Sequence, residues 1–279
     1  MGEWIETYRG IVSPWECDVT EHFTVAYYFD RLADAAALAA KAFGLVEPAR
    51  GPVRLDLRFV RELRAGASFH IESAPLEIVA DGVRLAHRFV DSASGESVTW
   101  VEQKLALPAL PAELRGNIDR RLVAWEGPPI EARPEPANHT GFFPTARDRV
   151  RPADLDENGQ LSLAGFVHRF TAACIQAQAA IGITAEYMEE ERRGYSTFEL
   201  KLAIDKAPRL GDAVLVETGI LHLGNSSVRF LHRMIEPDGS KELARLGQFG
   251  VQLDLDARRP APLPLAFKER AQALMVTGS

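Results

Sequence analysis

The chain has 279 residues, of which 46% are apolar, and a net charge of −7 from 32 basic and 39 acidic residues. This length suits two domains of ordinary size, and the acidic balance argues against a nucleic acid or an anionic membrane surface as partner. The N-terminus lacks the basic start and apolar core of a signal peptide, and no apolar run is long enough to cross a bilayer. We therefore expect a cytoplasmic protein without a membrane span.

Two cysteines occur, Cys17 and Cys174, and neither belongs to a close pair of the kind that zinc or redox sites use. Neither a disulfide nor a metal site is therefore expected. Cys17 stands beside Asp18, so a nucleophile is one interpretation. A small packing residue is the other, and it is favoured because no base is evident beside the thiol.

A polar turn precedes the first helical pattern, with Asp18 and His22 four residues apart in the segment 15–31. Downstream, apolar residues recur at spacings of three and four: Val25, Tyr28, Phe29, Leu32, Ala36, Ala39 and Phe43. This spacing predicts an amphipathic helix. Thr24 stands at its start, where a hydroxyl can accept a hydrogen bond from an unpaired backbone N–H.

Strand patterns follow the helix. Residues 53–59 alternate between apolar and charged side chains, and turn signals at 62–66, 80–82 and 92–96 separate three further strands. The predicted order is a strand, a long helix and then four strands in a meander. The helix can bury its apolar stripe only against the sheet, which indicates an α+β domain.

A proline-rich stretch follows between residues 108 and 140, and it shows neither helical nor strand periodicity. Its prolines are Pro108, Pro111, Pro128, Pro129, Pro134 and Pro136. We interpret this stretch as a linker. It closes a first domain, residues 1–125, and leads into a second domain, residues 140–279, which ends in an extension after Leu255.

The two predicted domains repeat one another. Residues 12–45 align without a gap on residues 150–183, and VRLAHR (83–88) falls on VRFLHR (228–233). Similarity at so long a spacing indicates two copies of one domain rather than a solenoid. The second copy therefore has its own polar turn at Asp156 and its own helix, which starts after Ser162.

The repeated VR..HR pattern places two arginines on one strand face of each copy, Arg84 with Arg88 and Arg229 with Arg233. Their guanidinium groups suit the phosphates of a nucleotide-like ligand. A solvated outer strand face is the alternative, and it is favoured. The histidines of the same pattern, His87 and His232, lie on apolar faces and are interpreted as hydrogen-bonded core residues.

A long alanine-rich helix wrapped by an antiparallel sheet and introduced by an Asp turn resembles the hotdog fold. The turn is similar to the D-x-x-G-H-x-N-x-x-x-Y pattern of the 4-hydroxybenzoyl-CoA thioesterase-like, or acyl-CoA thioesterase, family. The first copy matches this pattern at three positions and departs from it at two: Asp18, His22 and Tyr28, against Glu21 and Thr24. The second copy matches at two and departs at three: Asp156 and Gly159, against Gln160, Ser162 and Phe166. The resemblance covers residues 3–107 and 142–255 and implies two tandem hotdog domains, paired as an intrachain pseudo-dimer.

The resemblance implies an acyl-CoA thioesterase that needs no metal or cofactor, with coenzyme A as part of its small-molecule substrate. The coenzyme A phosphates are the ligand that the four strand arginines would bind: Arg84, Arg88, Arg229 and Arg233. The catalytic residues would be Asp18, as nucleophile or general base, with His22 and Thr24. His22 would polarise the carbonyl, orient the water or hold Asp18. Backbone N–H groups from His22 to Thr24 would form the oxyanion hole at the helix start. Asp156, Gln160 and Ser162 would form a second or vestigial site, and a homodimer of the chain is possible.

Several alternatives stay open. An aspartate ahead of a helix is often only a turn former, and Glu21 is either a second carboxylate of the site or a solvated turn residue. His168, Thr171 and Gln176 on the second helix either face Asp18 or are packing and surface residues. At the level of function, the alternatives are a hotdog protein that binds acyl-CoA without turnover, a hydratase or dehydratase, whose Asn-Pro and His pattern is not found, and a scaffold.

Overall fold

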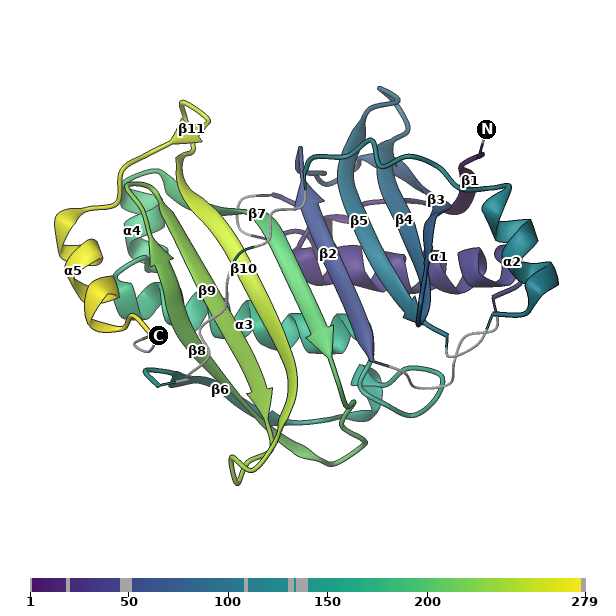
Figure 1. Ribbon diagram of the computed structural model, residues 1–279. Helices are drawn as coiled ribbons and strands as arrows, with labels where there is room; N and C mark the ends of the chain where they lie inside the picture. Colours follow the sequence, from purple (N-terminus) through teal and green to yellow (C-terminus); the bar gives the residue numbers. More distant parts are fainter. Residues whose placement is uncertain are drawn as a thin grey trace. The chain divides into compact units, whose positions relative to one another are not determined.

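The computed structural model describes residues 2–18, 21–45, 52–107, 110–129, 133 and 140–276. The backbone divides into two compact units, Met1–Ile130 with Ala203–Asp205 and Glu131–Leu202 with Lys206–Ser279. We call them the first unit and the second unit (Figure 1). In the described ranges, no helix is long and apolar enough to span a membrane.

The first unit is a sheet with one long helix. Its elements are β1 (Ile5–Ile11), the 3-10 turn η1 (Pro14–Glu16), α1 (Val25–Phe43), β2 (Val53–Phe59), β3 (Ser68–Val79), β4 (Gly82–Asp91), β5 (Ser97–Ala106) and α2 (Ala112–Asp119). The strands lie in the order β1-β3-β4-β5-β2, and all neighbours are antiparallel. This arrangement confirms the predicted α+β architecture of the first copy.

The prediction of a four-strand meander was wrong at its first strand. Only β3, β4 and β5 follow one another as neighbours, while β2 pairs with β5 at the far side of the meander. A tight turn at Ala80 and Asp81 forces β4 to lie beside β3, whereas the connection 60–67 is long enough to cross from one side of the sheet to the other. This crossing carries residues 62–66 past the start of α1.

Helix α1 has the bounds that the sequence predicted, and it lies along one face of the sheet (Figure 1). It buries a continuous stripe of side chains: Ala26, Tyr28, Phe29, Leu32, Ala35, Ala36, Ala39, Ala40 and Phe43. The alanines allow a close approach to the sheet, and each fully buried large side chain contributes about 1.5–3 kcal/mol. The helix ends at Gly44, whose left-handed φ of 73° closes its last turn.

The linker interpretation was wrong for the segment 112–119, which forms the helix α2. Ile118 is fully buried in a cluster with Phe43 and Leu105, and Leu114 packs against the same cluster. Two apolar residues at a spacing of four suffice to attach this short helix, but they are too few to stand out as a periodic pattern. Pro108, Pro134 and Pro136 lie outside the described residues.

The second unit repeats the first. Its elements are β6 (Phe143–Arg149), the 3-10 turn η2 (Pro152–Asp154), α3 (Leu163–Ile181), α4 (Ala185–Glu190), β7 (Arg193–Ile204), β8 (Ala213–Leu223), β9 (Ser227–Ile235), β10 (Glu242–Asp254), β11 (Arg259–Pro260) and α5 (Leu265–Ala273). The strand order β6-β8-β9-β10-β7 corresponds to β1-β3-β4-β5-β2. Helix α3 has its predicted start, and it contacts β6, β8 and β9. The pairing of the two copies as a pseudo-dimer stays a prediction.

A row of buried polar side chains crosses the sheet of each unit. Ser73 Oγ lies 2.7 Å from both Thr7 Oγ1 and His87 Nδ1, and His87 Nε2 lies 3.0 Å from Gln103 Oε1. In the second unit Thr218 Oγ1 takes the place of Ser73, 2.8 Å from Thr145 Oγ1 and 2.7 Å from His232 Nδ1. Both histidines are fully buried, which confirms their interpretation as hydrogen-bonded core residues.

Candidate active site

The turn ahead of α1 is closed by Asp18 and His22. The Asp18 N–H donates to the His22 carbonyl over 2.9 Å, and the His22 N–H donates to Asp18 Oδ1 over 3.2 Å. The side chain of Asp18 is exposed. One carboxylate oxygen of Asp18 therefore shapes the turn, as the turn-former alternative requires.

The second unit has the same turn. The Asp156 N–H donates to the Gln160 carbonyl over 2.8 Å, and Asp156 Oδ1 accepts from the Gln160 N–H over 2.9 Å. Asp156 Oδ1 also accepts from Asn158 N–H over 2.9 Å. The two hydrogen bonds between the first and last residues of the turn are thus the same in both units, while the side chain of the last residue differs, histidine in the first unit and glutamine in the second.

The turn 62–66 supplies the neighbours of His22 that sequence reasoning missed. Glu62 Oε2 and Arg64 Nη2 each lie 3.2 Å from His22 Nε2. A backbone bridge joins His22 to Arg64, and the Phe23 N–H donates to the Leu63 carbonyl over 2.8 Å. The sequence carried a signal in the acidic start of ELRAG, but only the crossing of residues 60–67 brings that carboxylate to the histidine.

His22 has partners of opposite kinds at one ring nitrogen. A proton on Nε2 is drawn to the Glu62 carboxylate, whereas a lone pair on Nε2 suits the guanidinium of Arg64. The side chains of His22 and Glu62 are 15% and 29% exposed, so solvent screens this pair only in part. A carboxylate that contacts a ring nitrogen orients the imidazole.

The expected oxyanion donors are engaged elsewhere, so this part of the prediction was wrong. The N–H groups of His22, Phe23 and Thr24 donate to Asp18 Oδ1, to the Leu63 carbonyl and to the Glu16 carbonyl respectively. These acceptors belong to segments that fold around the turn, and spacing along the chain does not disclose them. A helix N-terminus has four N–H groups without partners inside the helix, and the first ones here belong to Val25 and Ala26.

The two helix starts differ in their caps. Ser162 accepts the Gly165 N–H with its side chain over 3.0 Å, as predicted for an N-cap residue. Thr24 occupies the equivalent position, but its hydroxyl makes no capping hydrogen bond, so that part of the prediction was wrong. The Tyr27 N–H instead donates to the backbone carbonyl of Thr24 over 2.9 Å.

The second unit lacks the histidine and carboxylate pair. Gln160 stands in place of His22, and Ala207 stands in place of Glu62, at the start of the equivalent turn. The bridge between Gln160 and Arg209 shows that the two turns have the same register. Both members of the pair are therefore absent from the second unit, although the bridge between the two turns is present there as in the first.

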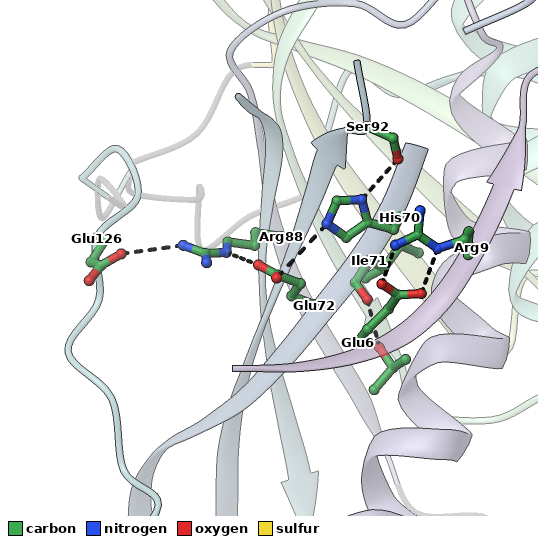
Figure 2. A network of polar contacts seen from close by, with 9 residues as sticks. Glu6, Arg9, His70, Ile71, Glu72, Arg88, Ser92 and Glu126 are labelled. Carbon is green, nitrogen blue, oxygen red and sulfur yellow. Dashed lines mark hydrogen bonds and ion pairs between the residues drawn. The ribbon is translucent and has the colours of Figure 1, made fainter. Parts of the chain in front are cut away.

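Ion pairs engage Arg84, Arg88 and Arg233 of the repeated strand pattern. Arg84 contacts Glu102 and Glu77, and this raises the pKa of the guanidinium. Arg88 lies between Glu72 at 2.6 Å and Glu126 at 3.4 Å (Figure 2). Its guanidinium also lies over the Trp4 ring.

In the second unit, Arg233 pairs with Glu217 over 2.9 Å and lies over the Phe142 ring, while Arg229 is only 7% exposed. A phosphate could bind Arg84, Arg88 or Arg233 only if the carboxylates that now pair with these arginines moved away. Phosphate binding by these four arginines stays a prediction.

The remaining candidate residues from the sequence are Cys17 and three residues of α3. Burial raises the pKa of the half-buried Cys17 thiol, which donates to the Ser13 carbonyl over 3.7 Å, and this fits a packing residue. On α3, His168 and Gln176 are exposed and Thr171 is half-buried. Their approach to Asp18 stays a prediction.

The second unit matches a protein family, and the whole chain has solved structural relatives. Residues 150–271 match the model of the thioesterase-like superfamily. An acyl-ACP thioesterase from Bacteroides thetaiotaomicron aligns with a TM-score of 0.66 at 14% identity, over 87% of this chain and 96% of that one. The 12:0-ACP thioesterase from Umbellularia californica aligns with a TM-score of 0.61 at 13% identity, over 92% and 94% of the two chains. At these identities the alignments show the fold. No curated protein sequence is significantly similar to the chain.

Proposed function

We propose that this chain, a hotdog protein of the thioesterase-like kind, hydrolyses the thioester of an acyl-CoA at the turn ahead of α1. The observation that carries the proposal is the contact of His22 Nε2 with Glu62 Oε2 at 3.2 Å. This contact supports a role for His22 as proton acceptor beside the N-terminus of α1, in the unit that has the motif histidine. Thioester hydrolysis requires both features: a group that activates water, and donors for the developing oxyanion.

In the proposed reaction, His22 takes a proton from a water molecule as the water oxygen attacks the carbonyl carbon. The carbonyl oxygen gains negative charge, which the N–H groups of Val25 and Ala26 and the positive end of the α1 dipole stabilise. The C–S bond then breaks, and the leaving sulfur takes the proton from His22. The products are a free acid and coenzyme A, and no metal or cofactor takes part. Glu62 orients His22 through its contact with Nε2.

Asp18 holds the backbone of His22 in this proposal. The assignment of nucleophile or general base to Asp18 remains a competing proposal for the same reaction. The two differ in what they require of the side chain, since a turn former needs only an oxygen acceptor, whereas a base or nucleophile needs a carboxylate. Asp156, Gln160 and Ser162 keep the turn without the pair and form a vestigial site.

The acyl group and its carrier define the substrate class. The solved relatives from Bacteroides thetaiotaomicron and Umbellularia californica are thioesterases of acyl-ACP. Acyl-ACP is therefore the second class of substrate to test, beside acyl-CoA.

The strand arginines can be tested as a binding site for the coenzyme A phosphates. If Arg84, Arg88, Arg229 or Arg233 binds these phosphates, its exchange for glutamine raises KM for an acyl-CoA and leaves KM for the shorter acyl-pantetheine unchanged. A homodimer of the chain stays a prediction.

The test is the release of free thiol from a panel of acyl-CoAs and acyl-ACPs of graded chain length. Wild type is compared with His22→Gln, Glu62→Gln and, as a matched control, His222→Gln on an exposed part of β8. Loss of the general base lowers kcat about 10²–10⁴-fold. We expect losses in this range for His22→Gln, a smaller loss for Glu62→Gln and no change for His222→Gln. If wild type binds acyl-CoA but releases no thiol, the proposed hydrolysis is wrong and the chain is an acyl-CoA binding protein.

A further inference from the structure

Tyr28 is a buried residue of α1 that the proposed reaction does not use. It is 2% exposed, and its ring packs against Phe23, Phe59 and Phe89 with centroids 4.6–5.2 Å away. Burial raises the pKa of Tyr28, so its hydroxyl stays protonated. The ring fills the core as a phenylalanine would, and what distinguishes a tyrosine here is the hydroxyl alone.

The hydroxyl of Tyr28 contacts the turn that carries Glu62. The Leu63 N–H donates to Tyr28 Oη over 3.1 Å, and the Leu63 carbonyl accepts from the Phe23 N–H over 2.8 Å. Both backbone polar groups of Leu63 are therefore fixed, one to α1 and one to the residue after His22. Since Glu62 directly precedes Leu63, this double attachment determines where its carboxylate lies relative to His22.

The second unit shows that the turn folds without the Tyr28 hydrogen bond. Phe166, in place of Tyr28, has no hydroxyl, and Pro208, in place of Leu63, has no N–H. The other attachment persists, because the Leu161 N–H donates to the Pro208 carbonyl over 2.9 Å. Donor and acceptor are thus both absent from the unit that also lacks the histidine and the carboxylate.

We propose that Tyr28 is a positioning residue for the His22–Glu62 pair: its hydroxyl, through the Leu63 N–H, holds Glu62 against the imidazole. This inference rests on the proposed function and deepens it. The fold of the turn does not require the hydroxyl, as the second unit demonstrates. The hydroxyl is present where the pair is present, and it touches neither substrate nor reacting atoms.

Removal of the hydroxyl should lower turnover and leave substrate binding alone. In Tyr28→Phe the ring remains, so the core keeps its packing. A misplacement of about 1 Å at a catalytic group costs up to about 10²-fold, so we expect kcat to fall about 10- to 100-fold and KM to change less than about twofold. Tyr195→Phe is the matched control, because it removes a tyrosine hydroxyl that donates to the Val228 carbonyl over 3.1 Å in the second unit. It should leave kcat unchanged.

A double variant separates positioning from a general loss of stability. If Tyr28 acts through Glu62, then Tyr28→Phe costs nothing further in a Glu62→Gln background, and the two effects are not additive. Independent structural damage would instead multiply the two losses. Additive effects, or a kcat of Tyr28→Phe equal to that of wild type, overturn the inference while the thioesterase itself stands.

Failure of the proposed function is recognised separately, by wild type that releases no thiol from any substrate of the panel. NMR on the same variants then tests whether Tyr28 positions the His22–Glu62 pair. Tyr28→Phe should speed amide exchange at Leu63 and shift the His22 imidazole ¹⁵N signals, and Tyr195→Phe should do neither. Unchanged His22 signals in Tyr28→Phe would overturn the inference without reference to activity.

Discussion

The backbone of Glu21 adopts the left-handed conformation of Gly159, its counterpart in the second unit, with φ of 63° against 71°. A glutamate in this region is strained, because its Cβ lies too close to the backbone, whereas glycine adopts it without penalty. We expect Glu21→Gly to raise the free energy of unfolding by about 0.5–1 kcal/mol and Gly159→Ala to lower it by a similar amount. Urea unfolding of both variants checks this, and a destabilised Glu21→Gly would show that the glutamate side chain stabilises the turn.

The role of the Asp18 side chain can be tested by comparing asparagine and alanine at this position. Asparagine retains an oxygen that accepts the His22 N–H, whereas alanine does not. We expect Asp18→Asn to keep kcat within about threefold of wild type, and Asp18→Ala to lose about tenfold or more because the turn loosens. Thiol release by the two variants measures this. Complete loss in Asp18→Asn, with the fold intact, would assign the base or nucleophile to Asp18 and leave His22 a supporting role.

The different caps of α1 and α3 predict different losses of stability. Ser162→Ala removes a hydrogen bond to the Gly165 N–H and should lower the free energy of unfolding by about 1 kcal/mol. Thr24→Ala removes no capping hydrogen bond and should cost less than about 0.5 kcal/mol. Chemical denaturation of the pair provides the comparison. Equal losses would mean that Thr24 caps α1 in solution.

Acid should destabilise the fold through its buried histidines. Burial lowers the pKa of His87 to about 4 and that of His232 to about 3. The unfolded chain, with histidine pKa values near 6.5, therefore binds protons that the folded chain does not. Stability is complete above about pH 6.5 and is lost progressively as the pH falls toward 4, by about 3 kcal/mol for His87.

The measurement is urea unfolding between pH 7.5 and 4, with His87→Gln for comparison. Because carboxylates also titrate in this range, the difference between the two proteins isolates the histidine. The free energy of unfolding of His87→Gln should fall less steeply below pH 6.5. Parallel curves for the two proteins would show that His87 takes up a proton in the folded state without penalty.

The long helices and the repeat could be predicted from the sequence because they depend on local spacing. The bounds of α1 follow from its apolar stripe and from Gly44, and both survive in the second copy. The short helix α2 was missed, because Leu114 and Ile118 alone do not make a periodic pattern. Helices whose apolar pattern repeats along the chain could be predicted from the sequence. The helix α2 depends on tertiary packing and could not.

The candidate site divides in the same way. Asp18 and His22 could be found because they lie in one turn, and the turn is shaped by their own backbone groups. Glu62 could not, because its contact with His22 depends on a crossing between two strands that are not neighbours in the sheet. The engaged N–H groups of Phe23 and Thr24 have acceptors in other segments, so a rule about helix starts alone overstated what they offer.

Pro208 makes the divergence of the second copy difficult to undo. The changes Gln160→His, Ala207→Glu and Phe166→Tyr would give the second unit the histidine, the carboxylate and the tyrosine of the first, but the tyrosine hydroxyl would still have no N–H at Pro208 from which to accept a hydrogen bond. Pro208 therefore prevents side-chain substitutions alone from giving the second unit the hydrogen bond that joins Tyr28 to Leu63 in the first.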